Sequence, residues 1–174
     1  MELILETERL WLREFVPDDA QACFELNRHP QVVRYTGESS PSSVEEVRQG
    51  LCNRPILDYR KHGFGRWAAI LKETGELIGM AGLKFLDDLQ EVDLGYRLLP
   101  KYWGLGLATE AARSCVDHGF DTLRLPRILG LVDPENIRSV RVLQKLGFVF
   151  DSVIGYGSQP AAKYVLERAA VADV

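Results

Sequence analysis

The sequence predicts an α+β fold in which a mixed, mostly antiparallel central sheet of about seven strands is flanked by about four helices. Three observations lead to this prediction. Helical and strand patterns interleave along the chain without an internal repeat. The strands expected in the middle of the chain are joined by turns that are too short for parallel connections. The length of 174 residues suits one core and is short for two, so we expect a single domain over residues 1–174.

The first part of the chain is expected to form one strand and two helices. In "RLWLREF" (9–15) apolar and charged residues partly alternate, as they do in a strand with one buried face. "PDDAQACFELNRHP" (17–30) begins with acidic residues and then places apolar residues at helical spacing. Farther on, Ser43 stands three residues before Glu46, which is the spacing of a capping box. A short helix over about 44–53 is therefore predicted.

The middle of the chain predicts three antiparallel strands and a long helix. "RWAAILKETGELIGMAGLKFL" (66–86) and "EVDLGYRLL" (91–99) contain three apolar runs, separated by the turn formers "KETGE" and "DDLQ". In "LATEAARSCVDHGF" (107–120) alanines and other apolar residues recur at helical spacing, which makes this the clearest helix of the sequence. "RILGLVD" (127–133) then indicates a buried strand. A further helix is expected to begin near Asp133 or Asn136 and to end before Gly147, and "FVFDSVI" and "AKYVLERA" close the chain as strands.

Composition and charge exclude several classes of protein. Apolar residues make up 46% of the chain and charged residues 26%, which is typical of a globular protein. The net charge of −4 argues against a nucleic-acid partner. Three scattered cysteines without clustered histidines indicate neither a disulfide framework nor a metal site, so we expect a reducing cytoplasm. An acidic amino end and the lack of an apolar run of about 18 residues make secretion and a membrane location unexpected.

The segment "KYWGLGLATEA" (101–111) places Gly104 and Gly106 directly before a helix. Close approach of an anion to the main chain requires residues without Cβ, and the start of a helix offers unpaired N–H groups and the positive end of its dipole. The pattern therefore favours a phosphate or diphosphate site, although two glycines can equally make a tight turn between a strand and a helix. The dinucleotide-binding fingerprint fits less well, because Thr109 stands where its last Gly or Ala belongs and an antiparallel hairpin precedes it.

Three segments together resemble the GNAT superfamily of acetyl-CoA-dependent N-acetyltransferases. They are "LGYRLLPKYWGLGLATEA", "VDPENIRSVRVLQKLGF" and the opening "ETERLWLREFVPDDAQACFELNRHPQVVRYTG", which is similar to the RimJ/RimL branch, whose members modify protein N-termini. The resemblance spans nearly the whole chain and implies one acetyl-CoA-dependent N-acetyltransferase domain. In that family the pattern Q/R-x-x-G-x-G/A cradles the pyrophosphate of coenzyme A. Lys101, Gly104 and Gly106 take its positions here, and Lys101 is a departure from it.

The resemblance also implies which residues meet the cofactor. The family's strand before the glycine motif splays from its neighbour at a bulge and binds pantetheine through its backbone, with the Leu98 amide as the expected oxyanion donor. Asn136 takes the place of a family residue that bonds the cofactor arm, but an Asn there can equally cap the helix. Arg141, like Arg138 and Lys145, either reaches the adenosine 3′-phosphate or belongs to a solvated basic face. The expected cofactor-binding residues are Tyr96, Arg97, Leu98, Trp103, Gly104, Leu105, Gly106, Leu107, Ala108, Thr109, Asn136, Ser139 and Arg141.

The chemistry requires a neutral amine. A lysine-like amine, with a pKa of about 10.4, loses its proton at pH 7 at a cost of about 4–5 kcal/mol, whereas a protein α-amine needs only about 1 kcal/mol. Glu91 and Asp93 lie two residues apart near the family's base and are the candidates for it, unless both are solvated carboxylates on the polar side of the strand. Leu143 stands where many family members have a tyrosine acid, so Ser139 is the candidate proton donor, directly or through a water, unless the thiolate leaves without a dedicated acid.

These inferences predict a cytoplasmic enzyme that moves acetyl from acetyl-CoA to a primary amine by direct attack in a ternary complex. The acceptor is a protein N-terminus or a small-molecule amine, and the protein is a monomer or a homodimer. The segments expected to select the acceptor, 38–66 and 155–162, show no recognisable pattern. A noncatalytic acyl-CoA-binding or regulatory domain is the alternative, since the family's tyrosine is missing.

Overall fold

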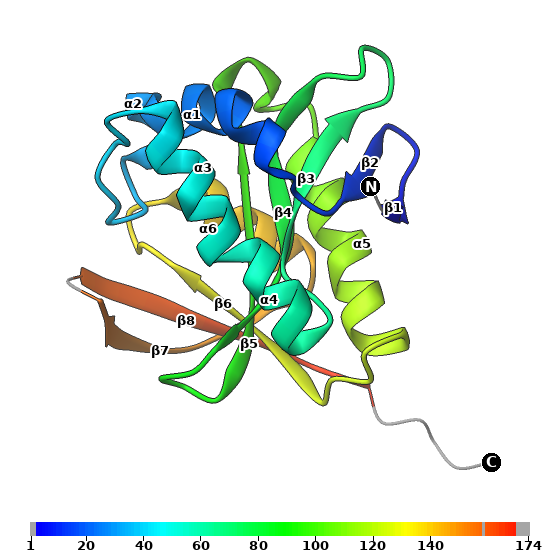
Figure 1. The fold of residues 1–174 in the computed structure, drawn as a ribbon. Helices are drawn as coiled ribbons and strands as arrows, with labels where there is room; N and C mark the ends of the chain where they lie inside the picture. Colours follow the sequence, from blue (N-terminus) through cyan, green and yellow to red (C-terminus); the bar gives the residue numbers. More distant parts are fainter. Residues whose placement is uncertain (1–2, 158, 170–174) are drawn as a thin grey trace.

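The computed structural model describes residues 3–157 and 159–169. Its strands form one eight-stranded sheet in the order β1-β2-β3-β4-β5-β6-β8-β7 (Figure 1). Neighbouring strands are antiparallel except for β5 and β6, which are parallel. The strands are β1 Leu3–Glu6, β2 Leu10–Arg13, β3 Arg66–Leu71, β4 Leu77–Leu86, β5 Glu91–Leu98, β6 Arg127–Val132, β7 Val149–Tyr156 and β8 Gln159–Glu167.

Helices pack on both faces of this sheet, because successive side chains of a strand point to opposite faces. In β3, Ala68 and Ile70 share a core with residues of α1 and α3, whereas Trp67 and Ala69 share one with residues of α5. In Figure 1, α3 and α4 cross in front of the sheet. The helices are α1 Ala20–Arg28, α2 Pro30–Val33, α3 Val44–Asn53, α4 Pro55–His62, α5 Leu107–Asp121 and α6 Ile137–Lys145, with short 3-10 turns η1 Pro17–Asp19 and η2 Pro100–Tyr102.

The predicted α+β class and mostly antiparallel sheet are confirmed, and the described residues contain one strand and two helices more than expected. Helix α3 has the predicted bounds, and the Glu46 amide donates to Ser43 Oγ at 3.1 Å, as in the predicted cap. The sequence analysis missed β1, α4 and the single turn α2. Helix α4 has weak apolar periodicity; it starts after Arg54 with a proline and ends at Gly63, whose φ is +77°.

The sheet opens between β5 and β6. Strand β5 is paired with β4 along its whole length, from Glu91 opposite Leu86 to Leu98 opposite Gly79, without a shift in register. Towards β6, Asp93 opposite Leu129 is the one paired position in the described part of the two strands. The expected bulge within β5 is therefore wrong: the strand stays in register with β4, and the opening arises because β6 diverges from it.

This opening exposes the backbone at the end of β5. The Leu99 amide donates to the carbonyl of Ile78 in β4 at 2.9 Å. Because backbone groups of successive strand residues point to alternate sides, the Leu98 amide points away from β4, into the gap between β5 and β6. The Leu98 carbonyl accepts a hydrogen bond from Trp103 Nε1 at 2.7 Å. The gap thus ends at the loop that contains the two glycines.

Candidate active site

The loop between η2 and α5 has the backbone conformation that its glycines predict. Gly104 and Gly106 both have φ of +80°, in the left-handed region that other residues rarely adopt. Among the described residues, no atom lies within 4 Å of where a Cβ on Gly104 would be. Gly106 is also the N-cap of α5, so it offers no side chain to the free amides of the first turn. The loop therefore presents main-chain donors and open space, as a diphosphate requires.

The other residues of the predicted cradle surround this loop. Leu105 is exposed and Leu107 is buried against the core, which anchors the start of α5. Ala108 and Thr109 follow in the first turn of α5, where both are half-buried. Lys101 turns away, because its Nζ lies 2.8 Å from Glu76 Oε1. The Lys101 side chain is therefore not directed at the glycine loop, and an anion bound there would contact the backbone of the loop.

Helix α6 approaches the loop from the other side of the gap. The Arg138 guanidinium lies over the Trp103 ring, 5.2 Å from its centroid. Asn136 caps the helix, since its Oδ1 accepts the Ser139 amide at 3.2 Å. The capping alternative for Asn136 is thus observed, while no contact of this residue with a ligand is tested. Arg141 is exposed on the same helix.

Tyr96 connects β5 with α6 across the gap. Its hydroxyl donates to the Ser139 carbonyl at 3.0 Å and lies 2.9 Å from Ser139 Oγ. Burial raises the pKa of this hydroxyl above its ordinary value, although the hydrogen bond with Ser139 opposes the shift, so Tyr96 keeps its proton at neutral pH. Leu143, at the family's tyrosine position, is buried in the core. Tyr96 is predicted to meet the cofactor through its backbone, whereas the role of its hydroxyl has no signal in the sequence, because no local pattern joins positions 43 residues apart.

Asp93 lies at the base of the gap and is almost fully buried, with 7% of its surface exposed. It forms an ion pair with Arg66 Nη2 of β3, and its Oδ1 accepts the Leu131 amide of β6 at 3.0 Å. Burial raises the pKa of Asp93 above its ordinary range, although the Arg66 guanidinium and the Leu131 amide oppose the shift. The alternative that Asp93 is a solvated carboxylate is therefore wrong.

The Arg66 side chain of β3 reaches Asp93 of β5 by crossing one strand, β4. Its Nη1 donates to the carbonyls of Gly82 in β4 and Asp93 in β5, the latter at 2.7 Å. A Cβ on Gly95 would lie 2.5 Å from Arg66 Cζ, so a larger residue there would collide with the guanidinium. The sequence analysis did not identify Arg66. Its only signal is the pair of glycines, Gly82 and Gly95, which face each other in adjacent strands.

Glu91 has the predicted orientation but different surroundings. It lies on the same face of β5 as Asp93, two residues farther from the glycine loop. Its carboxylate pairs with Arg127 of β6, with Arg127 Nε 3.1 Å from Glu91 Oε2. The two candidate bases thus lie on one face of β5, and each forms an ion pair with a different arginine, Asp93 with Arg66 and Glu91 with Arg127.

The Arg97 side chain points away from the gap towards the helices. Its Nη1 donates to Asn27 Oδ1 of α1 at 2.6 Å, and its Nη2 donates to Glu38 Oε2 at 2.8 Å. By the alternation described above, the Arg97 backbone points towards β4, opposite Met80, so neither the side chain nor the backbone of this predicted cofactor-binding residue is directed into the gap. The side chain instead fastens the loop that follows α2, and Gly37 in this loop lies against Gln159 of β8.

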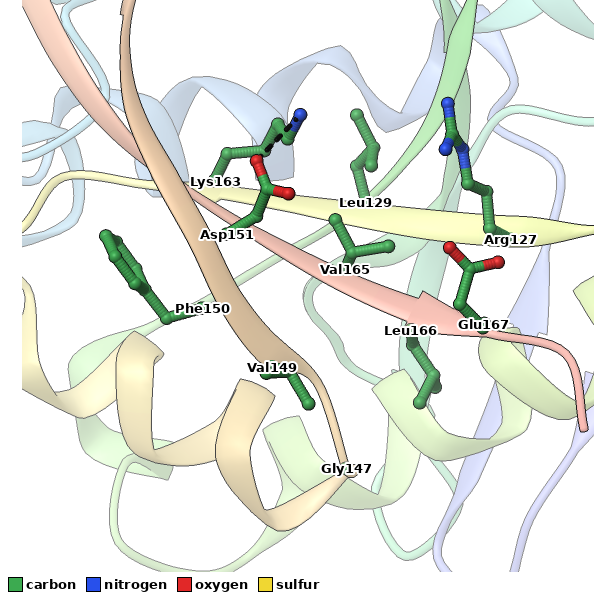
Figure 2. A pocket seen from close by; sticks show the side chains of 10 residues that line it. All are labelled: Arg127, Leu129, Gly147, Val149, Phe150, Asp151, Lys163, Val165, Leu166 and Glu167. Carbon is green, nitrogen blue, oxygen red and sulfur yellow. Dashed lines mark ion pairs between the residues drawn. The ribbon is translucent and has the colours of Figure 1, made fainter.

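A separate hollow of about 350 Å³ lies on the outer part of the sheet, among β6, β7 and β8 (Figure 2). Figure 2 shows Asp151 and Lys163 as an ion pair on its wall, 3.0 Å apart, beside Leu129 and Val165. None of the predicted cofactor-binding or catalytic residues lines it. The hollow and the gap between β5 and β6 are therefore different features.

Within residues 3–157 and 159–169, no three His, Cys, Asp or Glu side chains come together in a way that could hold a metal ion. In the same ranges, no helix combines the length and the apolar character that crossing a membrane requires.

Known proteins with similar sequence and structure point to the same kind of enzyme. YoaA of Bacillus subtilis (strain 168), described as an uncharacterized N-acetyltransferase, is 35% identical over 152 residues, which cover 87% of this chain and 85% of the relative. Spermidine N(1)-acetyltransferase of Escherichia coli (strain K12) is 28% identical over 138 residues, covering 79% of this chain and 71% of that protein.

Among solved structures, RimL, a ribosomal L7/L12 alpha-N-protein acetyltransferase in complex with coenzyme A, has a TM-score of 0.82. That likeness covers 95% of this chain and 98% of RimL at 16% identity, so it concerns the fold. A family model described as an acetyltransferase (GNAT) domain matches residues 9–149, which include the glycine loop, Asp93 and Ser139. The chain therefore belongs to the GNAT family of N-acetyltransferases, whose co-substrate is acetyl-CoA.

Proposed function

We propose that the protein transfers the acetyl group of acetyl-CoA to a primary amine by direct attack in a ternary complex. One observation carries the proposal: the gap between β5 and β6 has the glycine loop, with its exposed backbone, at one end and the buried carboxylate of Asp93 at the other. A diphosphate held at the first end would direct the rest of the donor along the gap towards the second. The acceptor is a small-molecule amine or the α-amine of a protein N-terminus.

The backbone of this chain would hold the donor. The Trp103 amide already donates to the Pro100 carbonyl at 3.0 Å, so the amides from Gly104 to Thr109 and the positive end of α5 are the groups that suit a diphosphate. The Leu98 amide, which points into the gap, suits the carbonyl oxygen that gains negative charge during transfer. Acetyl-CoA supplies an acetyl thioester whose carbonyl carbon accepts the amine. Asn136 and Arg141 would contact the arm and the nucleotide end of the donor, respectively.

Asp93 fits the role of proton acceptor better than Glu91. Its raised pKa makes it a stronger base than an ordinary aspartate, and the Arg66 guanidinium and the Leu131 amide fix the direction of its lone pairs. Each carboxylate oxygen can accept two hydrogen bonds, so capacity remains for an amine or a water. Glu91 is farther along the strand and paired with Arg127.

Ser139 is the proposed proton donor to the departing thiolate, supported by Tyr96. The Tyr96 hydroxyl lies 2.9 Å from Ser139 Oγ, and burial keeps it protonated. A proton given up by Ser139 Oγ can be replaced by the Tyr96 proton if the hydroxyl turns from the Ser139 carbonyl to Oγ, which would share the charge between two half-buried oxygens. This pair takes the place of the tyrosine that Leu143 replaces.

The acceptor would enter between the loop after α2 and the β7–β8 hairpin. Gly37 and Gln159 bring these two segments together, and Arg97 and Glu38 fasten the loop to β5. Both acceptor classes have support from similar proteins: the E. coli relative is named for spermidine, and RimL for a protein α-amine. The opening "ETERL" also supports the proposal that this chain belongs to the RimJ/RimL branch of the family.

A release assay for free coenzyme A tests this function. The purified protein is given acetyl-CoA with spermidine, with peptides that have a free α-amine, or with the same peptides after N-terminal acetylation as a matched control. We expect release with at least one free amine and none with the acetylated peptides. Binding of acetyl-CoA without release on any amine would instead support a noncatalytic acyl-CoA-binding domain, the reading that the buried Leu143 keeps open.

A further inference from the structure

The turn between β1 and β2 contacts the first turn of α5, more than one hundred positions later in the chain. Thr7 Oγ1 donates to Glu110 Oε1 at 2.6 Å, and the Arg9 amide donates to the same oxygen at 2.8 Å. Arg9 Nε donates to Glu110 Oε2 at 2.7 Å. The three residues Thr7, Arg9 and Glu110 are called the N-terminal clamp below. Both carboxylate oxygens of Glu110 are thus used to fasten this turn.

Arg9 extends the clamp into the glycine loop itself. Its Nη1 donates to the Leu105 carbonyl at 2.9 Å. A Cβ on Gly106 would lie 3.5 Å from Arg9 Nη2, which places the guanidinium directly beside the N-cap of α5. In the other direction, the Glu110 amide donates to the Gly106 carbonyl at 3.0 Å. The clamp therefore holds the loop at Leu105 and the helix at Glu110.

The loop needs such support for a physical reason. Glycine loses more backbone freedom on ordering than any other residue, and this loop holds two glycines in the left-handed region. Gly104 and Gly106 have no side chains with which to fix that conformation. A binding site whose donors are ordered in advance loses less entropy when the ligand binds. The clamp supplies the side-chain contacts that the glycines lack.

We propose that Thr7, Arg9 and Glu110 are positioning residues that hold the glycine loop in its diphosphate-binding conformation, so that the N-terminal hairpin is part of the cofactor site. This inference rests on the proposed diphosphate cradle. It also gives a function to two segments that are far apart in the sequence, since "ETERL" contains Thr7 and Arg9, and "GLATEA" contains Glu110. Thr7 and Glu110 would affect cofactor binding through the conformation of the glycine loop, and none of the three clamp residues donates a proton in the reaction.

The test compares the affinities of two ligands for Arg9→Met by calorimetry. Coenzyme A and dephospho-coenzyme A share the diphosphate and differ in the 3′-phosphate. We expect Arg9→Met to weaken both by a similar factor of about 10, because the change acts on the loop that receives the diphosphate. Arg48→Met is the matched control: its side chain is 40% exposed, against 43% for Arg9, and its ion pairs lie on η1 and α3. It should leave both affinities unchanged.

Two further variants keep the inference testable if Arg9→Met folds poorly. Arg9→Lys keeps the charge but cannot contact Leu105 and Glu110 together, so we expect it to lose most of the same affinity. Glu110→Gln keeps the shape of the carboxylate and should lower the affinities for coenzyme A and dephospho-coenzyme A about 3-fold or more. Full affinity in Arg9→Lys would overturn the inference, because charge alone would then suffice. A loss confined to coenzyme A would also overturn it, since Arg9 would then contact the 3′-phosphate.

The same measurements separate this inference from the proposed cradle. Gly106→Val places a branched side chain in the loop itself. If Gly106→Val binds coenzyme A as tightly as the unaltered protein, the cradle is wrong. If Gly106→Val loses binding while Arg9→Met and Glu110→Gln keep it, the cradle stands and the clamp is wrong.

Discussion

The two ends of the gap between β5 and β6 are built in different ways. At one end, residues 103–109 form the glycine loop, which is contiguous in sequence and offers main-chain groups. At the other end, Asp93, Arg66 and Leu131 come from three strands and meet through a buried side-chain ion pair. Most of the first end is exposed or half-buried, whereas Asp93 at the second end has only 7% of its surface exposed.

This difference follows from what each end must do. A diphosphate spreads its charge over several oxygens, so amides and a helix dipole can hold it if no side chain is in the way. Proton transfer needs one titratable group with a pKa shifted by its surroundings, and that shift requires burial and a fixed partner. The glycine loop therefore depends on the absence of side chains, whereas the other end depends on the buried side chain of Asp93 and its fixed partners.

The largest expected effect is at the glycine loop. Gly106→Val forces a branched residue into φ of +80° and fills the space beside the amides, so we expect the affinity for acetyl-CoA to fall about 100-fold or more. Calorimetry measures it. Gly75→Val is the control, because Gly75 has φ of +71° with no described atom near its Cβ position, in the turn between β3 and β4. It should lose similar stability and keep its affinity.

The next effect concerns the buried end. Asp93→Asn should lower kcat at pH 7 by about 100-fold or more while the affinity for acetyl-CoA changes little, because the variant cannot accept a proton. The loss should shrink as the pH approaches the pKa of the amine, since the acceptor then arrives without its extra proton. Glu91→Gln removes a carboxylate from the same face and should change kcat less than threefold, about 0.6 kcal/mol. Equal losses in the two folded variants would contradict the assignment of Asp93.

A smaller effect is expected between the two ends. Tyr96→Phe removes the hydroxyl beside Ser139 Oγ and should lower kcat about 10-fold with a smaller change in KM for acetyl-CoA. Ser139→Ala should lower it by at least as much, and the double variant should cost little more than Ser139→Ala alone. Tyr102→Phe removes a hydroxyl that donates to Glu76 at 2.6 Å and serves as the control. Additive losses in the double variant would show that the two hydroxyls act separately.

The smallest effect is a pH dependence of stability at the clamp. Burial raises the pKa of Glu110, but the hydrogen bonds from Thr7 and Arg9 outweigh it, so the pKa lies below its ordinary value of 4.5. A lowered pKa in the folded state means that the charged form stabilises the fold above about pH 4.5, and that this contribution is lost as the pH falls through the folded pKa. The free energy of unfolding of Glu110→Gln should therefore be about 1–2 kcal/mol lower at pH 6, and this difference from the unaltered protein should shrink as the pH falls below 4.5.

Urea unfolding of both proteins from pH 3 to pH 7 measures this difference. Glu8→Gln is the control, since it removes an exposed carboxylate from the same turn. A difference between Glu110→Gln and the unaltered protein that stays constant over the whole range would mean that the charge of Glu110 does not stabilise the fold.

Local signals explain how much could be predicted from the sequence. The bounds of α3 followed from Ser43 and Glu46, and the start of α5 from the glycine pair, because a cap or a left-handed turn is specified by neighbouring residues. Strand β1 has four residues and α4 has little apolar periodicity, so neither gave a pattern long enough to interpret.

The candidate site also has a part that local sequence predicts and a part that it does not. The conformation of the glycine loop could be predicted because its residues are contiguous. The partners of Asp93 and Tyr96 could not, because Arg66 and Ser139 are 27 and 43 positions away and only the register of the sheet and the packing of α6 bring them close. The clamp was hidden for the same reason. Sequence spacing predicts what one element does alone, and the chemistry here depends on contacts between elements.

One pair of residues, Asp93 and Leu129, joins β1–β5 to β6–β8 within the described sheet. In mechanical terms the sheet consists of two leaves, which are joined at this one backbone pairing and by side-chain contacts such as Glu91 with Arg127 and Tyr96 with Ser139. A molecule bound in the opening would contact both leaves and add to these contacts, so it should raise the melting temperature by mass action. Acetyl-CoA is therefore also expected to stabilise the fold, and backbone hydrogen exchange should slow in both leaves together when it binds.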